Sequence, residues 1–209
     1  GDWSSDVCSS DLALVLQRVD EQFNLSGAAR VNMAKNILMN TSRPQFDTGL
    51  YNAYMQTALP YSPRRQGAGL MDLHAAMGTP VVVTEAQSGI GKVALKEIDN
   101  KASFKLLLTN FGDKDAVYKA SGTVQTDLVE EGYNLVETGG IFKAETISEE
   151  APYMGEFPIE ITSANGVEGD AGLEVTVPAN ETVEVEVTVD LTDTVEWMQN
   201  VPLEDVFEN

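Results

Sequence analysis

Two neighbouring stretches near the carboxyl end alternate apolar and polar residues, and this pattern constrains the fold more than any other feature. In the first stretch, Leu173, Val175 and Val177 are separated by glutamate and threonine. After a Pro-Ala-Asn-Glu turn at 178–181, valine recurs at every second position from 183 to 189, again separated by glutamate or threonine. A period of two is typical of a half-buried strand, and a one-residue slip would bury glutamates. The pattern predicts an antiparallel hairpin with one apolar and one acidic face.

Residues 81–191 carry further short runs with strand character. Turn residues separate these runs, as in all-β domains. About seven strands over roughly 100 residues predict a β-sandwich of two sheets. Residues 192–209 contain Trp197 and Pro202 but show no strong period. The other predicted strands cover residues 81–84, 92–98, 104–108, 117–128 with a bend at Gly122, 141–147 and 158–163.

The first 80 residues have a helical period instead. Apolar residues at helical spacing predict one helix over 13–23 and a second over 26–40, with Ser26 as its N-cap. Residues 43–66 read as a loop, and residues 70–77 as a short helix. Gly78-Thr79-Pro80 is a break that predicts a domain boundary. The fold class is therefore mixed, with a helical segment followed by an all-β sandwich.

Charge is distributed very unevenly along the chain. Residues 1–80 have a net charge of −1, whereas residues 81–209 have −19 and contain no Lys or Arg after position 143. Such a field repels nucleic-acid phosphates and anionic lipid, so both are disfavoured as partners. No apolar run reaches the roughly 18 residues of a membrane span. Cys8 is the single cysteine, which excludes an intrachain disulfide.

Catalytic chemistry has few candidate residues here. His74 is the only imidazole. It could act as a general base, but no glycine-rich nucleophile turn accompanies it, so we favour a plain helix residue. Gly67 and Gly69 could suggest a phosphate loop, yet they lack the Lys and the third Gly of that motif. We favour a close-packed turn for both glycines.

Other polar and aromatic residues also have two interpretations. The pair Arg64 and Arg65 could bind an anion, although an ion pair or a solvated turn is commoner. Asp113 and Asp115 could contribute to a calcium site, but a short acidic turn provides too few oxygens, and turn chemistry is favoured. Asp170 has the same interpretation. An aromatic set could stack on sugar, or pack in a core as isolated aromatics usually do: Tyr153, Phe157 and Trp197.

Several segments resemble a known family. The string DWSSDVCSSDL at 2–12 resembles a translated sequencing adapter, and we expect residues 1–12 to be an artefact and disordered. KNILMNTS at 35–42 and YSPRRQGAGLMDLHAAM at 61–77 resemble the carboxyl-terminal part of subtilisin-like cell-envelope serine peptidases, the lactocepin and complement-fragment peptidase group. GTPVVVT at 78–84, with residues 104–110, looks like the fibronectin type III-like domain that follows the protease in that group.

The resemblance implies a fragment of a secreted, cell-wall-anchored subtilisin-like endopeptidase that acts on protein or peptide substrates. Residues 13–80 would be the end of the peptidase domain, 81–191 the fibronectin type III-like sandwich, and 192–209 a truncated approach to its closing strand. The family nucleophile, in a Gly-Thr-Ser motif, would precede residue 13. This piece would then hold no catalytic, cofactor or metal residue and be inactive, although the parent could bind calcium. The remainder of the peptidase domain would be a partner.

A second hypothesis assigns the chain to another class of protein. In it, the sandwich is a non-catalytic extracellular adhesion or binding module, and the acidic face over 174–190 contacts a basic partner. The fragment hypothesis makes its own physical prediction. Helices separated from a larger core should expose apolar side chains, and a missing closing strand should leave an open sheet edge. The side chains expected to be exposed are Leu14, Val15, Ile37 and Leu38.

Overall fold

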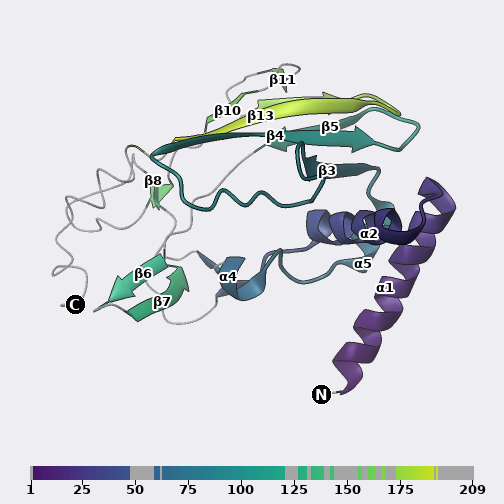
Figure 1. Cartoon of the computed structure of the whole chain (residues 1–209), viewed down its shortest axis with the longest axis horizontal. Coiled ribbons are helices and arrows are strands. Elements are labelled where there is room, and N and C mark those ends of the chain that lie inside the picture. The colour runs from purple at the N-terminus through teal and green to yellow at the C-terminus, as the bar shows by residue number, and fades with distance from the viewer. Residues whose placement is uncertain are drawn as a thin grey trace.

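The protein is described here from a computed structural model. The structure describes residues 2–47, 59–61, 63–120, 127–130, 133–138, 142–143, 155–156, 160–162, 166–167, 173–190 and 192. Strands β4, β5 and β13 lie together along one side of the molecule, and β3 lies beneath them (Figure 1). Helices α2 and α5 pack below β3, and α1 runs down one flank to the amino terminus (Figure 1).

The helical segment contains two long helices, as the sequence predicts. Helix α1 spans Asp2–Phe23 and α2 spans Gly27–Thr41, after an extended Ser26 whose side chain makes no capping bond. Within the predicted loop, the short strands β1 (Phe46–Asp47) and β2 (Leu59–Pro60) pair, and α4 covers Pro63–Gln66. The third predicted helix is α5, Leu73–Gly78. It begins after Asp72, whose carboxylate accepts a hydrogen bond from Ala75 N at 3.0 Å.

The start of α1 differs from the expected disorder over residues 1–12. The helix already begins at Asp2, eleven residues before the predicted start. Once a helix is nucleated by an apolar face, each further residue adds one hydrogen bond at little cost. Aspartate is also favoured near a helix amino terminus, where it faces the positive end of the dipole. The polar residues of this segment therefore extend the helix, even though they lack an apolar stripe.

The β-rich part contains two principal antiparallel sheets. A four-stranded sheet has the order β10-β13-β4-β3, and a three-stranded sheet has the order β11-β12-β5. Two small pairs, β6–β7 and β8–β9, complete the described strands. The bounds are β3 Val81–Glu85, β4 Lys101–Asn110, β5 Ala116–Ala120, β6 Asp127–Glu130, β7 Tyr133–Thr138, β8 Phe142–Lys143, β9 Gly155–Glu156, β10 Glu160–Thr162, β11 Gly166–Val167, β12 Leu173–Val177 and β13 Thr182–Asp190.

The two alternating strands form as predicted but do not pair with each other. Strand β12 pairs with β5, whereas β13 pairs with β4 over nine residues. The predicted hairpin is therefore wrong, because the turn at 178–181 carries the chain from one sheet to the other. Asn180 has a φ of 58°, a left-handed conformation that asparagine tolerates in turns. The valines of the two strands consequently face each other across the sandwich and fill one core.

That core is lined by the residues that the alternation places inward. Valines 175 and 177 come from one sheet, and valines 183, 185 and 187 from the other, with Val81 and Leu108 beside them. The register sets Val185 opposite Leu106 and Glu184 opposite Leu107. Buried Asn110 joins the sheets, since its Nδ2 donates to Val177 O at 2.9 Å and to Lys114 O at 2.8 Å. Its polar atoms are thus satisfied, as a buried amide requires.

The predicted strand at 92–98 is not a strand. Burial does alternate there, because Val93 and Leu95 are partly buried while Lys92, Ala94 and Lys96 are exposed. No strand pairs with this segment within the described residues. The period of two therefore reports a segment with one covered face, which turns at Lys96 with a left-handed φ of 59°, and not a place in a sheet. The strand predicted over 117–128 coincides in part with β5 and β6, and residues 121–126 lie outside the described part. The strand predicted over 141–147 overlaps β8, and the one predicted over 158–163 overlaps β10.

Helices α1, α2 and α5 enclose a second core. Val15, Val19, Ala34, Ile37 and Ala76 are buried there together with Val82 of β3. The prediction of exposure is therefore wrong for Val15 and Ile37, both 0% exposed, and Leu38 is only partly buried. It is right for Leu14, which is 43% exposed. The helices pack against one another and against β3, and this packing buries most of the apolar side chains that were expected to be exposed.

Candidate functional site

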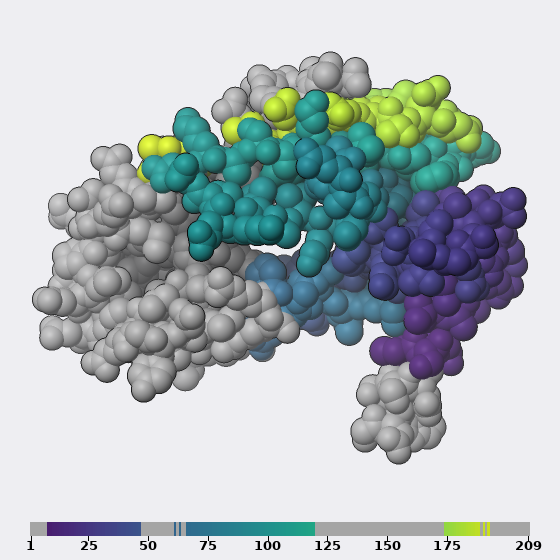
Figure 2. Space-filling view, viewed as in Figure 1, coloured from purple at the N-terminus to yellow at the C-terminus, as the bar shows by residue number. Residues whose placement is uncertain are grey.

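Strand β3 is shared between the two cores, and this junction is the first candidate site. Val81 belongs to the sandwich core and Val82 to the helical core, and each is 3% exposed. Successive side chains of a strand point to opposite faces, so one short strand serves both cores. Figure 2 shows the helical segment, coloured purple to blue, packed directly against the teal strands. The helices and the sandwich are therefore in contact across β3.

A buried arginine strengthens the junction. Arg18 of α1 is 5% exposed and donates through Nη1 to Ala76 O and through Nη2 to Thr79 O, the latter at 2.5 Å. Its Nε donates to Gln22 at 2.9 Å. These carbonyls lie at the end of α5, where the dipole favours a cation. Burial lowers the pKa of the Arg18 guanidinium from its ordinary value. The side chain thus ties α1 to the residues that enter β3.

Two asparagines of α2 bind the backbone of the β-rich part. Asn36 donates through Nδ2 to Gly89 O at 2.9 Å and accepts from Gly91 N at 2.8 Å. One turn later, Asn40 Oδ1 accepts from Val83 N at 2.6 Å, on the edge of β3 that faces away from β4. These bonds close an edge that would otherwise offer free amides. Helix α2 is therefore fixed to both β3 and the segment that follows it.

An aromatic contact completes the junction. Phe23, at the end of α1, meets Phe111, which follows β4, with ring centroids 4.5 Å apart and planes at 89°. This edge-to-face arrangement is a favourable geometry for aromatic pairs. The Arg18 guanidinium lies 6.0 Å from the Phe23 ring centroid. A smaller hollow of about 270 Å³ lies beside this contact, between α2 and the β3–β4 pair.

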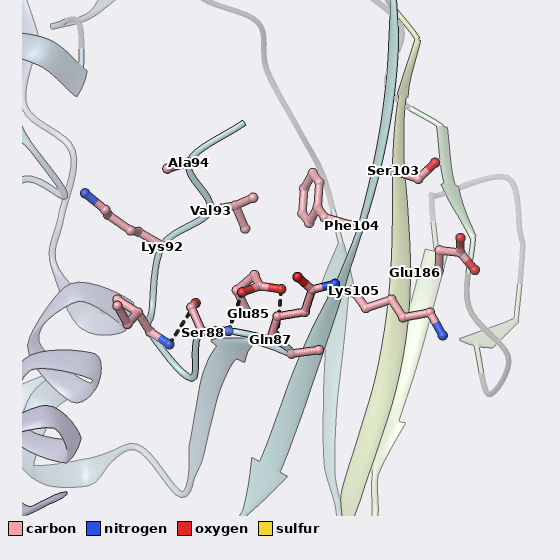
Figure 3. Close-up of a pocket in the computed structure, with 12 residues that line it drawn as sticks. Glu85, Gln87, Ser88, Lys92, Val93, Ala94, Ser103, Phe104, Lys105 and Glu186 are labelled. Carbon is pink, nitrogen blue, oxygen red and sulfur yellow. Dashed lines mark hydrogen bonds between the residues drawn. The ribbon is translucent and has the colours of Figure 1, made fainter. Parts of the chain in front are cut away.

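The second candidate site is a hollow of about 510 Å³ between residues 85–94 and strands β4 and β13. Figure 3 shows Val93 pointing toward Phe104, with Lys92 extending away from that ring and with Ser103, Lys105 and Glu186 on the side of the strands. The turn at its end is held by Glu85, whose carboxylate accepts from the backbone N–H groups at 87 and 88 at 2.9 and 2.6 Å. The hydrogen bond from Gln87 N is the largest cause that holds the pKa of Glu85 below its ordinary value.

Three of the sequence-derived candidates, His74, Gly67 and Gly69, lie in α5 or in the segment just before it. His74 is exposed on α5. Gly69 has a φ of +117°, and a Cβ there would overlap the Arg43 carbonyl, so the glycine is needed for the close turn that the sequence predicts. Gly67 is also left-handed, with a φ of +63°, but a Cβ there would meet nothing within 4 Å.

The charged candidates have local roles or lie outside the description. Asp115 Oδ1 accepts from Ala179 N at 2.9 Å, which holds the turn between β12 and β13. Arg64 and Arg65 lie in α4, and their side chains fall outside the described part of the chain, as do Tyr153, Phe157, Asp170 and Trp197. Among the described residues, no cluster of three or more His, Cys, Asp or Glu could hold a metal ion.

The predicted acidic face is not one surface. Because β12 and β13 belong to different sheets with their valines inward, Glu174 points outward on one side of the sandwich and Glu184 on the other. Glu184 is also paired with Lys105 at 2.6 Å, and Asp190 with Lys101 at 2.5 Å. The continuous acidic surface on which the adhesion hypothesis relied is therefore divided and partly neutralised.

The residues that hold the junction were not found by the sequence analysis. Arg18 lies three residues after Val15, on the apolar face of α1. A charged residue at such a position could have indicated a buried partner. Asn36 and Asn40 occupy the same face of α2 one turn apart, beside buried Ile37. Polar residues inside an apolar stripe need a partner. Their partners lie about 40 to 60 positions away in the chain, which local patterns do not reveal.

Two facing antiparallel sheets around a valine-rich core define a β-sandwich, and comparison with known proteins agrees. The profile of the family described as "Fn3-like domain" matches residues 93–204, just over half of the chain. The chain belongs to this Fn3-like domain family. No helix among the described residues is long and apolar enough to cross a membrane.

Curated relatives include peptidases. A C5a peptidase of Streptococcus pyogenes is 27% identical over 128 residues, which cover 61% of this chain and 10% of that protein. A PII-type proteinase of Lacticaseibacillus paracasei and a PI-type proteinase of Lactococcus lactis subsp. cremoris are each 28% identical over 166 residues, 77% of this chain and 7% of theirs. The chain thus spans a tenth or less of these relatives. The two proteinase alignments are longer than the Fn3-like match and must extend beyond it.

Proposed function

We propose that this chain is part of a secreted, cell-wall-anchored serine endopeptidase of the subtilisin-like type. In this proposal, residues 13–80 end the peptidase domain, residues 81–191 form the Fn3-like sandwich, and residues 192–209 lead toward its closing strand. The observation that carries the proposal is the extent of similarity to the two proteinases, which exceeds the Fn3-like domain. Part of the chain before residue 93 therefore lies within the similarity to these proteinases.

The packing of the helices supports this role. The helical segment shares β3 with the sandwich through Val82 and is clamped by Arg18. On α1, Leu14 remains 43% exposed, which suits a helix that packs against further peptidase residues. The function of the piece is then architectural. It would complete the peptidase core and hold the sandwich at a fixed position, where it helps to place protein substrates.

The chemistry of the parent enzyme lies outside this piece in our proposal. Acyl transfer needs a nucleophile, a base and oxyanion donors in mutual contact. His74 is exposed on α5, and among the described residues no carboxylate is hydrogen-bonded to its imidazole. We expect this chain alone to be inactive. Any calcium of the parent would be held by residues elsewhere.

The experiment that tests the proposal is to recover the coding sequence upstream of codon 13 from the source DNA. We expect the adapter-like string to be absent and a Gly-Thr-Ser motif to lead into the helix at Ala13. The longer protein should hydrolyse casein and lose that activity when the motif serine is changed to alanine. A start codon in the native DNA directly before the codons for residues 2–12 would contradict the proposal, and the binding-module hypothesis would then be tested.

A further inference from the structure

The connection between β3 and β4 has a bonded half and an unbonded half. In the first half, Gly89 N donates to Glu85 O at 2.9 Å and Gly91 N donates to Asn36 Oδ1 at 2.8 Å. Residues 92–100, by contrast, make no hydrogen bond or ion pair with any described residue. Only packing holds this unbonded segment among the described residues. Connections of this length without helix or strand are uncommon unless they have a function.

Packing against the unbonded segment is also slight. Val93 and Leu95 are partly buried, whereas all five residues of 96–100 are exposed. The 510 Å³ hollow lies beside the start of the segment, and Figure 3 shows Val93 pointing toward Phe104 there. Because opening the segment breaks no hydrogen bond to a described residue and uncovers little apolar surface, its opening free energy lies at the low end of the range within one fold.

Lys96 holds a backbone conformation that lysine disfavours. Its φ of 59° lies in the left-handed region, where the Cβ crowds the following carbonyl. The other described non-glycine residues with positive φ are Asn24 and Asn180, and asparagine tolerates this region better. A peptidase cleft takes its substrate as an extended strand. Relaxation of Lys96 to an extended conformation would therefore relieve strain as the segment enters such a cleft.

Exposure alone does not distinguish Lys96 from the other lysines. Lys35, Lys114 and Lys119 are exposed as well, but each lies in bonded backbone. Lys35 is inside α2 and Lys119 is in β5, while the carbonyl of Lys114 accepts from Asn110 Nδ2 at 2.8 Å. Exposed connections with few hydrogen bonds are the preferred positions of proteolytic nicking. The fold therefore singles out Lys96.

We propose that residues 96–98 are a processing site at which an endopeptidase cuts this chain. An enzyme selective for lysine takes the bond Lys96–Glu97, and one selective for glutamate takes the bond Glu97–Ile98. The step is hydrolysis: water adds its oxygen to the carbonyl carbon as the C–N bond breaks, and its protons pass to the new amine and carboxylate. The site is a property of this fold and does not depend on the proposed function.

The cut leaves one folded complex of two pieces. The amino-terminal piece keeps the helices and β3, and β3 stays paired with residues 106–110 of β4. This piece also supplies Val81 to the sandwich core and Phe23 to the ring contact with Phe111. Because the chain has a single cysteine, no disulfide joins the pieces, and the stability of the complex depends on its concentration.

Limited proteolysis of the full chain, followed by mass spectrometry, tests the site. Among the bonds of the described residues, we expect trypsin to cut after Lys96 at least about ten-fold faster than after Lys114 or Lys119. Lys96→Gln should abolish that cut, while Lys114→Gln, at another exposed lysine, should leave its rate unchanged. A glutamate-specific endopeptidase should cut both Lys96→Gln and the unchanged chain after Glu97, and faster than after Glu181, which is exposed in a bonded turn.

Hydrogen exchange and gel filtration provide two further readouts. The amides of Glu97 and Ile98 should exchange within about ten-fold of the rate of an unstructured peptide, and the bonded Gly91 amide more slowly. The cut chain should elute as one species, and its Tm, unlike that of the intact chain, should fall on dilution. Equal or faster cutting after Lys114, Lys119 or Glu181, or strong protection of the Glu97 amide, would overturn the processing site. Separation of the pieces without denaturant would overturn the complex.

Discussion

The replacement Arg18→Met tests the junction most sharply. Methionine keeps an apolar stem of similar length but removes the guanidinium that donates to Ala76 O, Thr79 O and Gln22. Two carbonyls at the end of α5 then lose their charged donor in a region from which water is largely excluded. The change also removes the cation that lies 6.0 Å from the Phe23 ring centroid, at a position where Arg18 is 5% exposed.

The expected cost follows from the groups left unpaired. A buried polar atom without its partner costs about 1–3 kcal/mol, so two such carbonyls predict a loss of about 2–6 kcal/mol. For a chain of this size, each kcal/mol lowers Tm by about 2–4 °C, which predicts a fall of about 4–24 °C. Arg18→Lys should give an intermediate loss, because one ammonium cannot match the planar fork that reaches both carbonyls.

Calorimetry and circular dichroism on the purified full chain provide the assay. Arg30→Met is the matched control, since Arg30 pairs with Asp20 at the surface, where their side chains are 34% and 47% exposed. Its Tm should stay within about 2 °C of the unchanged chain. If Arg18→Met shifts Tm no more than Arg30→Met, the clamp does not hold the junction and the reasoning is wrong.

Three further predictions concern the turn, the core and acid stability. Gly69→Ala should lower the free energy of unfolding in urea by more than about 2 kcal/mol. Gly78→Ala is the control, because the space around its Cβ is open, and it should cost less. Equal effects of the two changes would contradict the close turn at Arg43. Val177→Ala, at a fully buried site, should cost about 2 kcal/mol, and Val117→Ala on exposed β5 much less; similar costs would contradict the sandwich core. A hydrogen bond from Lys101, the largest cause, and hydrogen bonds from Thr192 lower the pKa of Asp190 from 3.8 to about 2. The Asp190 carboxylate therefore stabilises the fold fully above about pH 4, and this stabilisation is lost as the pH falls toward 2. The Tm difference between the unchanged chain and Asp190→Asn should therefore shrink between pH 4 and pH 2, and a constant difference would contradict this assignment.

Side-chain periodicity predicted strands β12 and β13 and the faces that they bury, but it did not predict their partners. The valines of β12 and β13 are inward, as the alternation requires, yet the two strands lie in different sheets. A period of two fixes the face of a residue and leaves the backbone partner open. The same limit explains the segment at 92–98, where burial alternates but no strand pairs within the described residues.

The junction could not be predicted because its bonds join distant positions. Arg18 reaches carbonyls 58 and 61 residues away, and Asn36 reaches a backbone carbonyl 53 residues away. Those carbonyls belong to Ala76, Thr79 and Gly89, and a carbonyl carries no side-chain signature. The Asp72 cap of α5, by contrast, acts three residues along the chain, and such local patterns are readable in advance.

The helical segment and the sandwich, which share β3 between their two cores, are expected to unfold as one cooperative unit. Native-state hydrogen exchange of the Ile37 amide in α2 and the Val185 amide in β13 tests it directly. One unit predicts the same opening free energy at both amides, and an equal fall at both in Arg18→Met. If the Ile37 amide exchanges at a much lower free energy than Val185, and Arg18→Met leaves Val185 unchanged, the helices and the sandwich unfold independently and the claim is contradicted.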